Sequence, residues 1–438
     1  MPVDNDDPID FDIQPDEVVI TEIAKRWATD YSQVGYLGYS VALHGDLAIA
    51  GAIYSDMQGT NSGSAHIFER NYGGPNNWGE RKVLLPANGA DNEAFGWDVA
   101  INSDHAFVLK ARDQLDDKEG PVLYYYRKDQ GGTDNWGYVK KRVLNGGGVN
   151  FNRRGLALLV TDDLLFIGGP CDDAVNSPPG CVFIHSRNLG GTNNWGLLRE
   201  IRSDESMGGD RFGEALALDG DRLVVGAPVM TRDVDTYRAG TVYVFERNEG
   251  GTDNWGQVVK ILKPGTAVLD DYFGSAVAVS GDYLMVGFPN DDYWGENAGA
   301  VYVFYRNEGG DNAWGSVQKI IPDEHPQLAV AGEFGKSIAT KGPILFAGAH
   351  KCQDILHQEF YYPGTVFSYF NNKATEDPFE PFIRVRFDYS QEPYTTSGFG
   401  YDLATDGNTL MVGFYRGGDL EMPTGTQPGE VVFYDIEY

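Results

Sequence analysis

The amino-acid sequence predicts an all-β fold, a seven-bladed β-propeller of four-stranded antiparallel blades, and three observations lead to this prediction. One sequence pattern recurs seven times at near-constant spacing, and each copy contains short alternating segments separated by tight turns. Glycine occurs 56 times and aromatic residues make up 13% of the chain, which is typical of many short strands joined by turns. The last copy lacks its final strand, and a matching strand precedes the first copy.

The clearest copy of the pattern begins at Phe212-Gly213. An alternating segment follows, then a turn at residues 219–221 and an apolar segment that ends at Gly226-Ala227-Pro228. After a loop, residues 240–247 alternate again, and residues 257–262 supply a fourth strand. Four antiparallel strands form one blade, and a ring of blades leaves only short, protected sheet edges. A β-helix would show a much shorter period and no repeated hairpin turns.

Successive copies of the pattern start 58 to 65 residues apart. The glycines that open the seven copies are Gly38, Gly96, Gly155, Gly213, Gly274, Gly335 and Gly400. We expect these glycines to let neighbouring sheets approach closely, and the Phe before most of them to pack between blades. Two copies depart from the pattern: the second has Lys110-Ala111 where others have Gly-Ala, and the third has Arg154 before its glycine. These two blades should be the least regular.

The two ends of the chain predict how the ring closes. The last copy stops after its third strand, at residues 429–438, and residues 17–23 resemble the fourth strands of other copies. The N-terminal strand is therefore expected to complete the last blade, which would remove an open sheet edge. Residues 1–17 are then a flexible acidic N-terminal arm that is available to dock on an assembly partner. Residues 18–438 form a single propeller domain.

The charge of the chain restricts its partners. The formal net charge is −30, so binding to nucleic acid, which requires Lys and Arg to neutralise phosphates, is not expected. Cationic ligands, divalent ions and neutral sugars remain compatible with this charge. No apolar run of about 20 residues occurs, which argues against membrane insertion by a helix. The first residues lack the basic and apolar regions of a signal peptide.

Two of the three cysteines, Cys171 and Cys181, bracket one loop. They form a candidate disulfide, which would favour an oxidising compartment. The alternative is a pair of reduced, buried thiols. Zinc is disfavoured, because two thiols ten residues apart without a paired CxxC make a poor site. Cys352 has no obvious partner in the sequence.

A second signature lies between the third and fourth strands of five copies. It reads Asn/Asp, any residue, Gly-Gly, three further residues and then Trp-Gly, with the tryptophans at Trp78, Trp136, Trp195, Trp255 and Trp314. Exposed tryptophans beside amides would be sugar platforms, and five equivalent copies would provide multivalency. The alternative, which we favour, is a Gly-Gly turn whose Trp packs on the outer edge of the blade.

These residues resemble the FG-GAP repeats of integrin α-subunit propellers, and more closely the bacterial FG-GAP family. The resemblance covers residues 18–438 and implies a propeller with an adhesion or binding role at the cell surface or outside the cell. Several integrin repeats hold calcium in long Asp/Asn-rich loops between the first two strands. Here each of these links is a tight turn such as Asp219-Gly220-Asp221, too short for the six to eight oxygen ligands of calcium. We therefore expect no metal and no cofactor; calcium is the alternative, although integrin-type loops are absent.

The loops between the second and third strands differ among copies and gather near the axis on one face, where binding residues are commonly found. The candidate ligand-binding residues lie in two of these loops and pair aromatic with charged side chains. They are Asp233, Asp235, Tyr237, Arg238, Asp291, Asp292, Tyr293 and Trp294. Such a combination suits a glycan, a basic group of a peptide or a cation. The alternative is a set of solvated loops without a ligand.

The sequence contains no G-x-S-x-G, HExxH or P-loop motif, and no carboxylate pair stands out in so acidic a chain. The function that it predicts is an extracellular or cell-surface, non-enzymatic binding or adhesion module for a glycan or protein partner. Two alternatives remain open. One is a structural component of a surface or virion assembly, and the other is an enzyme that acts on polysaccharide.

Overall fold

A computed structural model of the chain describes most of the propeller. The described residues are 18–27, 35–87, 89–111, 121–144, 156–170, 180–203, 210–229, 239–265, 272–293, 295–322, 332–352, 364–372, 378–385, 398–414 and 429–438. Within them the chain forms 28 β-strands and no helix, and hence no helix that could span a bilayer.

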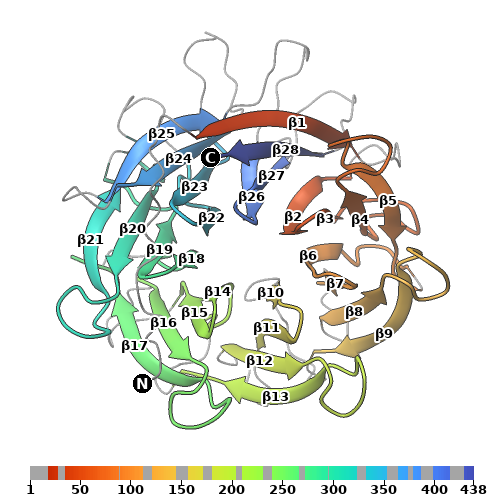
Figure 1. The fold of residues 1–438 in the computed structure, drawn as a ribbon, viewed down its shortest axis with the longest axis horizontal. Coiled ribbons are helices and arrows are strands. Elements are labelled where there is room, and N and C mark those ends of the chain that lie inside the picture. Colours follow the sequence, from red (N-terminus) through yellow and green to blue (C-terminus); the bar gives the residue numbers. More distant parts are fainter. Residues whose placement is uncertain are drawn as a thin grey trace.

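The strands form seven four-stranded antiparallel sheets around a central axis, as the sequence predicts (Figure 1). We call the sheets blades 1 to 7 and their strands A to D from the axis outward. Blade 1 contains β2 (Leu37–His44), β3 (Leu47–Ala52), β4 (Ser64–Glu69) and β5 (Gly79–Leu84). Blade 2 contains β6 (Phe95–Ile101), β7 (His105–Lys110), β8 (Val122–Arg127) and β9 (Gly137–Val143). Blade 3 contains β10 (Ala157–Val160), β11 (Leu164–Pro170), β12 (Gly180–Ser186) and β13 (Gly196–Ile201).

The remaining blades repeat this order. Blade 4 contains β14 (Ala215–Asp219), β15 (Arg222–Ala227), β16 (Thr241–Glu246) and β17 (Gly256–Leu262). Blade 5 contains β18 (Ala276–Ser280), β19 (Tyr283–Phe288), β20 (Ala300–Tyr305) and β21 (Gly315–Ile320). Blade 6 contains β22 (Ile338–Lys341), β23 (Ile344–Ala349), β24 (Thr365–Asn371) and β25 (Phe379–Val385). Blade 7 contains β26 (Phe399–Thr405), β27 (Thr409–Phe414), β28 (Glu430–Glu437) and β1 (Val19–Trp27).

The N-terminal strand closes the ring, which confirms the predicted latch. Strand β1 is the outermost strand of blade 7 and pairs with β28 from Val19–Glu437 to Trp27–Glu430. It also contacts blade 1: Arg26 donates from Nε to the Trp78 carbonyl oxygen at 3.0 Å and from Nη2 to Asn77 Oδ1 at 2.7 Å. Strand β5 contacts blade 2 in the same way, since Lys82 Nζ donates to Asn135 Oδ1 at 3.2 Å. The N-terminal segment thus serves as an ordinary outer strand.

The phenylalanine of an opening pair packs between blades, as expected, and Phe273 is an example. Phe273 belongs to one buried cluster with Val242 and Val244 of blade 4 and with Tyr302 and Phe304 of blade 5. Its ring meets those of Tyr302 and Phe304 edge-on, with centroids 5.9 and 6.1 Å apart. Such edge-to-face pairs add to the free energy gained by burying the rings. The core of the protein is therefore a ring of inter-blade clusters.

The opening glycine of one blade touches the Gly-Ala of the blade before it. A Cβ added at Gly226 of blade 4 would lie 2.1 Å from the carbonyl oxygen of Gly274 of blade 5, and Gly168 and Gly213 are closer still, at 1.9 Å. The strand register places Leu109 of blade 2 where blade 1 has Gly51. The second copy therefore departs from the Gly-Ala pattern at Leu109-Lys110, one residue before the Lys110-Ala111 that the sequence predicts. Leu109 packs in one core cluster with Leu165 and Ile167 of blade 3, and Arg154 lies outside the described residues. Both blades nevertheless contain four strands.

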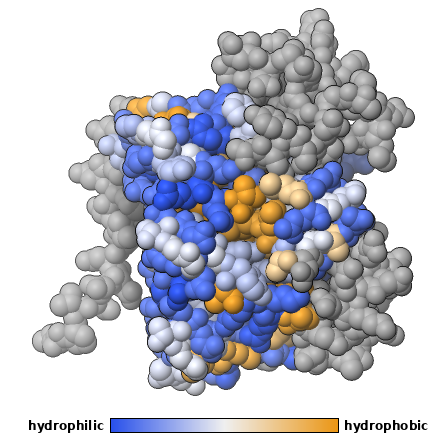
Figure 2. Space-filling model, turned by 90° about the vertical axis from the view of Figure 1, so that its right-hand side faces the viewer, coloured by the Kyte–Doolittle hydropathy of each residue, from blue (hydrophilic) through white to orange (hydrophobic). Residues whose placement is uncertain are grey.

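The described part of one side of the disc is mainly hydrophilic (Figure 2). Figure 2 views the side that carries β5 and β9 in Figure 1, and it shows hydrophobic residues gathered in the middle of this edge. The described outer strands with large exposed hydrophobic side chains are β1, β9, β13 and β17.

Candidate functional site at the channel mouth

The two faces of the disc differ in what they can offer a ligand. Because the strands are antiparallel, the A–B and C–D turns of all blades lie on one face, which we call the turn face. The opening Phe-Gly pairs and the B–C loops lie on the other, which we call the loop face. The axis carries a channel of about 410 Å³ that is lined by the A strands of all seven blades.

The tryptophans of the turn face are buried, so the sugar-platform interpretation is wrong. The Gly-Gly turn is confirmed, but the Trp packs between blades and not on the outer edge: the Trp78 ring stacks on Phe433 of blade 7 with centroids 4.4 Å apart. The five side chains are at most 3% exposed. Each loop is closed by its own hydrogen bonds: in blade 1 the amide of Trp78 donates to the Arg70 carbonyl oxygen at 2.8 Å, and the amide of Asn76 donates to Asn71 Oδ1 at 3.1 Å. The polar groups of the signature therefore hold the turn.

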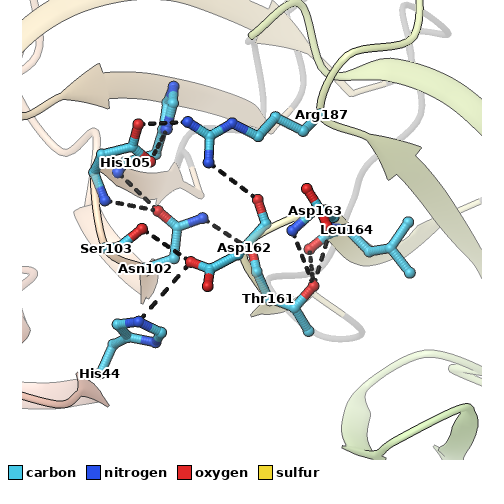
Figure 3. A network of polar contacts seen from close by, with 10 residues as sticks. His44, Asn102, Ser103, His105, Thr161, Asp162, Asp163, Leu164 and Arg187 are labelled. Atoms are coloured by element: carbon cyan, nitrogen blue, oxygen red, sulfur yellow. Dashed lines mark hydrogen bonds and ion pairs between the residues drawn. The ribbon is translucent and has the colours of Figure 1, made fainter.

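Polar groups of neighbouring A–B turns also bond to one another (Figure 3). Asn102 Nδ2 donates to the Thr161 carbonyl oxygen, and Ser103 Oγ donates to Asp162 Oδ1, both at 2.9 Å. His44 of blade 1 approaches the same Asp162 carboxylate at 3.9 Å. These contacts join blades 1, 2 and 3 across the turn face and use side chains that a ligand would otherwise need.

The structure describes three of the eight candidate residues, and it gives two of them internal partners. Asp291 is 5% exposed, and its carboxylate accepts from Lys319 Nζ at 2.7 Å and from the Tyr293 amide at 3.0 Å. Asp292 Oδ1 accepts from the Asn297 amide at 2.7 Å and closes the loop. Tyr293 is 72% exposed, with the Lys319 ammonium 4.8 Å from its ring centroid. Of these three residues, Asp291 is buried, whereas Asp292 and Tyr293 are exposed.

The other five candidates, Asp233, Asp235, Tyr237, Arg238 and Trp294, lie outside the described residues and stay predictions.

Three aromatic residues that the sequence analysis missed form an arc around the start of the channel. Tyr401, Tyr39 and Trp97 each follow the opening glycine of their blades, 7, 1 and 2, and are half-buried. The ring of Tyr39 lies 5.2 Å from that of Tyr401 and 5.2 Å from that of Trp97. His350 of blade 6 extends the arc, since its ring meets Tyr401 edge-on at 5.1 Å. Aligning the seven copies at this one position would have revealed the aromatic group.

Two carboxylates line the channel next to this arc. Asp98 and Asp402 occupy the second position after the opening glycine, where blades 3 to 5 have Ala157, Ala215 and Ala276. Asp98 bridges three blades, because it accepts from Ser40 Oγ at 2.7 Å and from the Leu158 amide at 2.6 Å. Asp402 accepts from the Val41 amide at 2.7 Å. The channel is therefore polar on one side and aliphatic on the other.

Burial raises the pKa of Asp98 to about 6 and that of Asp402 to about 7. In the unfolded chain such groups titrate near 4, so the folded state holds the protons more tightly. The two carboxyl groups therefore contribute most to the free energy of unfolding below about pH 4. This contribution is lost as the pH rises through about 7.

We therefore expect the free energy of unfolding to fall more between pH 5 and pH 8 in the wild type than in Asp402→Asn. The difference should be about 1 kcal/mol or more, a value that allows for solvent in the channel. Urea titrations at both pH values measure it. Equal pH slopes for the two proteins would show that Asp402 is ionised throughout.

One buried trio has the geometry of a hydrolase triad. The Ser64 hydroxyl lies 2.9 Å from His66 Nε2, and His66 Nδ1 lies 2.8 Å from Glu80 Oε2. Glu80 can only accept in its ionised form, so His66 donates from Nδ1 and accepts from Ser64. Ser64 and His66 are both 0% exposed. Because no substrate reaches the hydroxyl, the trio holds strands β4 and β5 together and is not a catalytic site.

The candidate disulfide has one member in the described part of the chain. Cys181 is buried at the start of β12, and Cys171 lies outside the described residues, so the pairing stays a prediction. Alkylation of the denatured protein without reductant should label one of the three cysteines. Labelling of all three, read by mass spectrometry, would show that the loop is not cross-linked.

A family model described as FG-GAP repeat matches residues 20–68, 195–245 and 255–304. Each matched segment runs from a D strand into the A, B and C strands of the next blade, and the first of them starts in β1. The family model thus aligns β1 as a D strand, and this is the position that β1 occupies in blade 7. No curated protein matches the chain. With these repeats and its seven four-stranded blades, the chain is an FG-GAP repeat β-propeller protein.

Proposed function

We propose that the protein is an extracellular, non-enzymatic binding module that recognises a glycan or a protein partner through its loop face. The observation that carries this proposal is the arc of Tyr401, Tyr39 and Trp97 at the start of the channel. These side chains come from three blades and are half-buried, although a propeller needs no aromatic residue at this position. The other four blades have Leu156, Glu214, Ser275 and Lys336 there.

The chemistry of this face suits a ligand with both apolar and polar surfaces. Aromatic rings held by their neighbours contribute apolar contact area at low entropic cost, and their faces pack on sugar rings or on apolar side chains. Asp98 and Asp402 provide acceptors in the channel beside the arc. The exposed ring of Tyr293 adds a further contact on the loop of blade 5. By contrast, the described loops of the turn face use their polar groups internally.

Two further observations support a binding role over an enzymatic one. The FG-GAP propeller is a fold of binding and adhesion-type modules. In the trio Ser64, His66 and Glu80, which has the distances of a catalytic triad, Ser64 and His66 are closed to solvent. The extracellular location rests on the predicted Cys171–Cys181 disulfide, which forms in oxidising compartments.

A glycan array and an affinity pull-down from a source extract test the proposal together. Trp97→Ala and Tyr39→Ala should weaken binding about tenfold or more, which corresponds to about 1.4 kcal/mol, because aromatic residues at the centre of an interface carry much of the binding energy. Tyr72→Ala is the matched control: Tyr72 is also exposed, at 43%, but it lies on the turn face.

The two assays separate the ligand classes. Array binding that is lost in the arc variants indicates a glycan, and pull-down binding that is lost in the same variants indicates a protein partner. Binding that survives both variants would place the contact elsewhere, and the proposal for this face would be wrong. The array is repeated with a chelator, because loss of binding would reveal a role for calcium.

A further inference from the structure

Strand β9 is the most unusual outer strand of the propeller. It is the edge strand of blade 2, so the backbone groups on its outer side pair with no other strand of the sheet. Tyr138, Val139 and Val143 are 42%, 40% and 39% exposed, and β9 contains no acidic residue. The hydrophobic residues in the middle of the edge shown in Figure 2 face solvent on this side of the disc. An exposed, apolar edge of this kind is a surface to which another strand can add by backbone hydrogen bonds.

Two of the three cations of this strand, Lys140 and Arg142, contact neutral groups of blade 3. Lys140 Nζ donates to the Asn194 carbonyl oxygen, and Arg142 Nη1 lies 3.1 Å from His185 Nε2. Neither cation forms an ion pair with a described carboxylate, although the chain has a net charge of −30. Burial and the nearby Arg142 lower the pKa of His185 to about 4, so its ring stays neutral beside them. An acidic segment that binds along β9 could form ion pairs with Lys140 and Arg142.

The sequence contains a segment with the complementary pattern. Residues 1–17 include seven acidic residues and no basic one. Within them residues 9–13 read Ile-Asp-Phe-Asp-Ile, a strict alternation of apolar and acidic side chains. In a strand, this alternation places Ile9, Phe11 and Ile13 on one face and the two aspartates on the other.

We propose that residues 9–13 of one copy of this chain add as an extra strand to the outer edge of β9 in a second copy. Lys140 and Arg142 lie on one face of β9 and Lys141 and Val143 on the other, and Val139 is the extra residue of a β-bulge between Tyr138 and Lys140. One register therefore brings Asp10 and Asp12 beside Lys140 and Arg142, and apolar side chains of the segment beside Val143 and the aliphatic stem of Lys141. Main-chain hydrogen bonds along the edge supply further affinity.

The reach of the chain assigns the segment to a second copy and not to its own ring. Residue 13 is five residues before Val18, and five extended residues span at most about 18 Å. In the ring, blade 1 lies between β1 of blade 7 and β9 of blade 2 (Figure 1). Packed sheets lie about 10 Å apart, so two blade steps exceed about 20 Å, and the blades splay further at the rim. The donor and acceptor surfaces are therefore on different molecules.

Such a contact is head-to-tail, because each chain offers one arm and one acceptor edge. Interfaces of this kind build rings or open filaments, depending on whether the rotation closes. The protein would then assemble with itself through a surface that is separate from the loop face.

Light scattering coupled to size exclusion, over a range of protein concentrations, tests the proposal. The full chain should form oligomers, and deletion of residues 1–16, which leaves Val18 and β1 in place, should give monomers with an unchanged melting temperature. Phe11→Asp and Val139→Asp should each abolish association. The matched controls are Val3→Asp in the arm and Leu197→Asp on β13, where the side chain is 43% exposed, and both should associate like the wild type.

Mixing provides the decisive measurement. Phe11→Asp retains an intact acceptor edge and Val139→Asp retains an intact arm, so an equimolar mixture should form a heterodimer although each variant alone is monomeric. A monomeric full chain, or self-association that persists without residues 1–16, would overturn the proposal. Failure of the mixture to dimerise would do the same, because it would show that the two segments do not bind each other.

Discussion

A chain that lacks residues 1–27 will be largely unfolded at temperatures at which a chain lacking only residues 1–16 is native. The longer deletion removes β1, which completes blade 7, and the shorter one does not. Val18, just before β1, and Ala24 of β1 are 4% and 7% exposed, and Ile20 and Ile23 of β1 pack against two core clusters. Burial of one such aliphatic side chain contributes about 1.5–3 kcal/mol. Together these residues rival the whole net stability of a domain, about 5–15 kcal/mol.

Deletion of β1 also opens the ring. Without it, the outer edge of β28 is unpaired, and blade 1 loses the hydrogen bonds that Arg26 makes to Asn77 and to the Trp78 carbonyl oxygen. An unpaired edge next to an apolar core promotes aggregation as well as unfolding. Circular dichroism and light scattering during heating measure both effects. Equal melting temperatures for the two truncations would mean that the interactions of β1 contribute no net stability.

Gly168→Ala will cost about 3 kcal/mol or more, whereas Gly169→Ala will change the stability by less than about 1 kcal/mol. The two glycines are neighbours on β11. A Cβ at Gly168 would lie 1.9 Å from the carbonyl oxygen of Gly213 in the next blade, and backbone atoms there cannot turn aside as a flexible side chain does. A Cβ at Gly169 would meet only Leu156 Cδ2, at an ordinary contact distance of 3.7 Å.

Urea denaturation of the two variants measures this difference under identical conditions. The pair isolates the close approach of blades, because both changes add the same methyl group to the same strand. If the two variants were equally stable, the blades would have to separate at no cost, and the Gly–Gly contact would not explain why the repeat keeps glycine there. The equivalent position in blade 2 is Leu109, whereas the other six blades have glycine there.

The architecture was predictable from the sequence because it rests on local patterns that repeat. Four strands per copy are specified by alternation with a period of two and by turns such as Asp219-Gly220-Asp221. Seven copies are specified by the regular spacing of the opening glycines. The missing last strand and the surplus first strand specify closure. None of these features requires knowledge of which side chains meet across blades.

The candidate site was less predictable, because its residues meet only after the ring has closed. Tyr401 and Tyr39 are more than 360 residues apart in the chain and lie 5.2 Å apart in space. The sequence marked Asp291 and Asp292 as ligands because they stand beside aromatic residues. It could not show that the Asp291 carboxylate, in a loop, pairs with Lys319 on β21.

By itself, the sequence determined the number of blades, their strand order and the closure by β1, since these follow from hydrophobic period and turn chemistry along the chain. Only the tertiary structure decided which side chains are available to a partner. It buries Trp78 and its four equivalents, bonds Asp98 to the backbone of the next blade and leaves the arc of Tyr401, Tyr39 and Trp97 half-exposed. The physical reason is that burial and pairing depend on the neighbouring blade, and a residue's neighbours along the chain do not specify its neighbours across the ring.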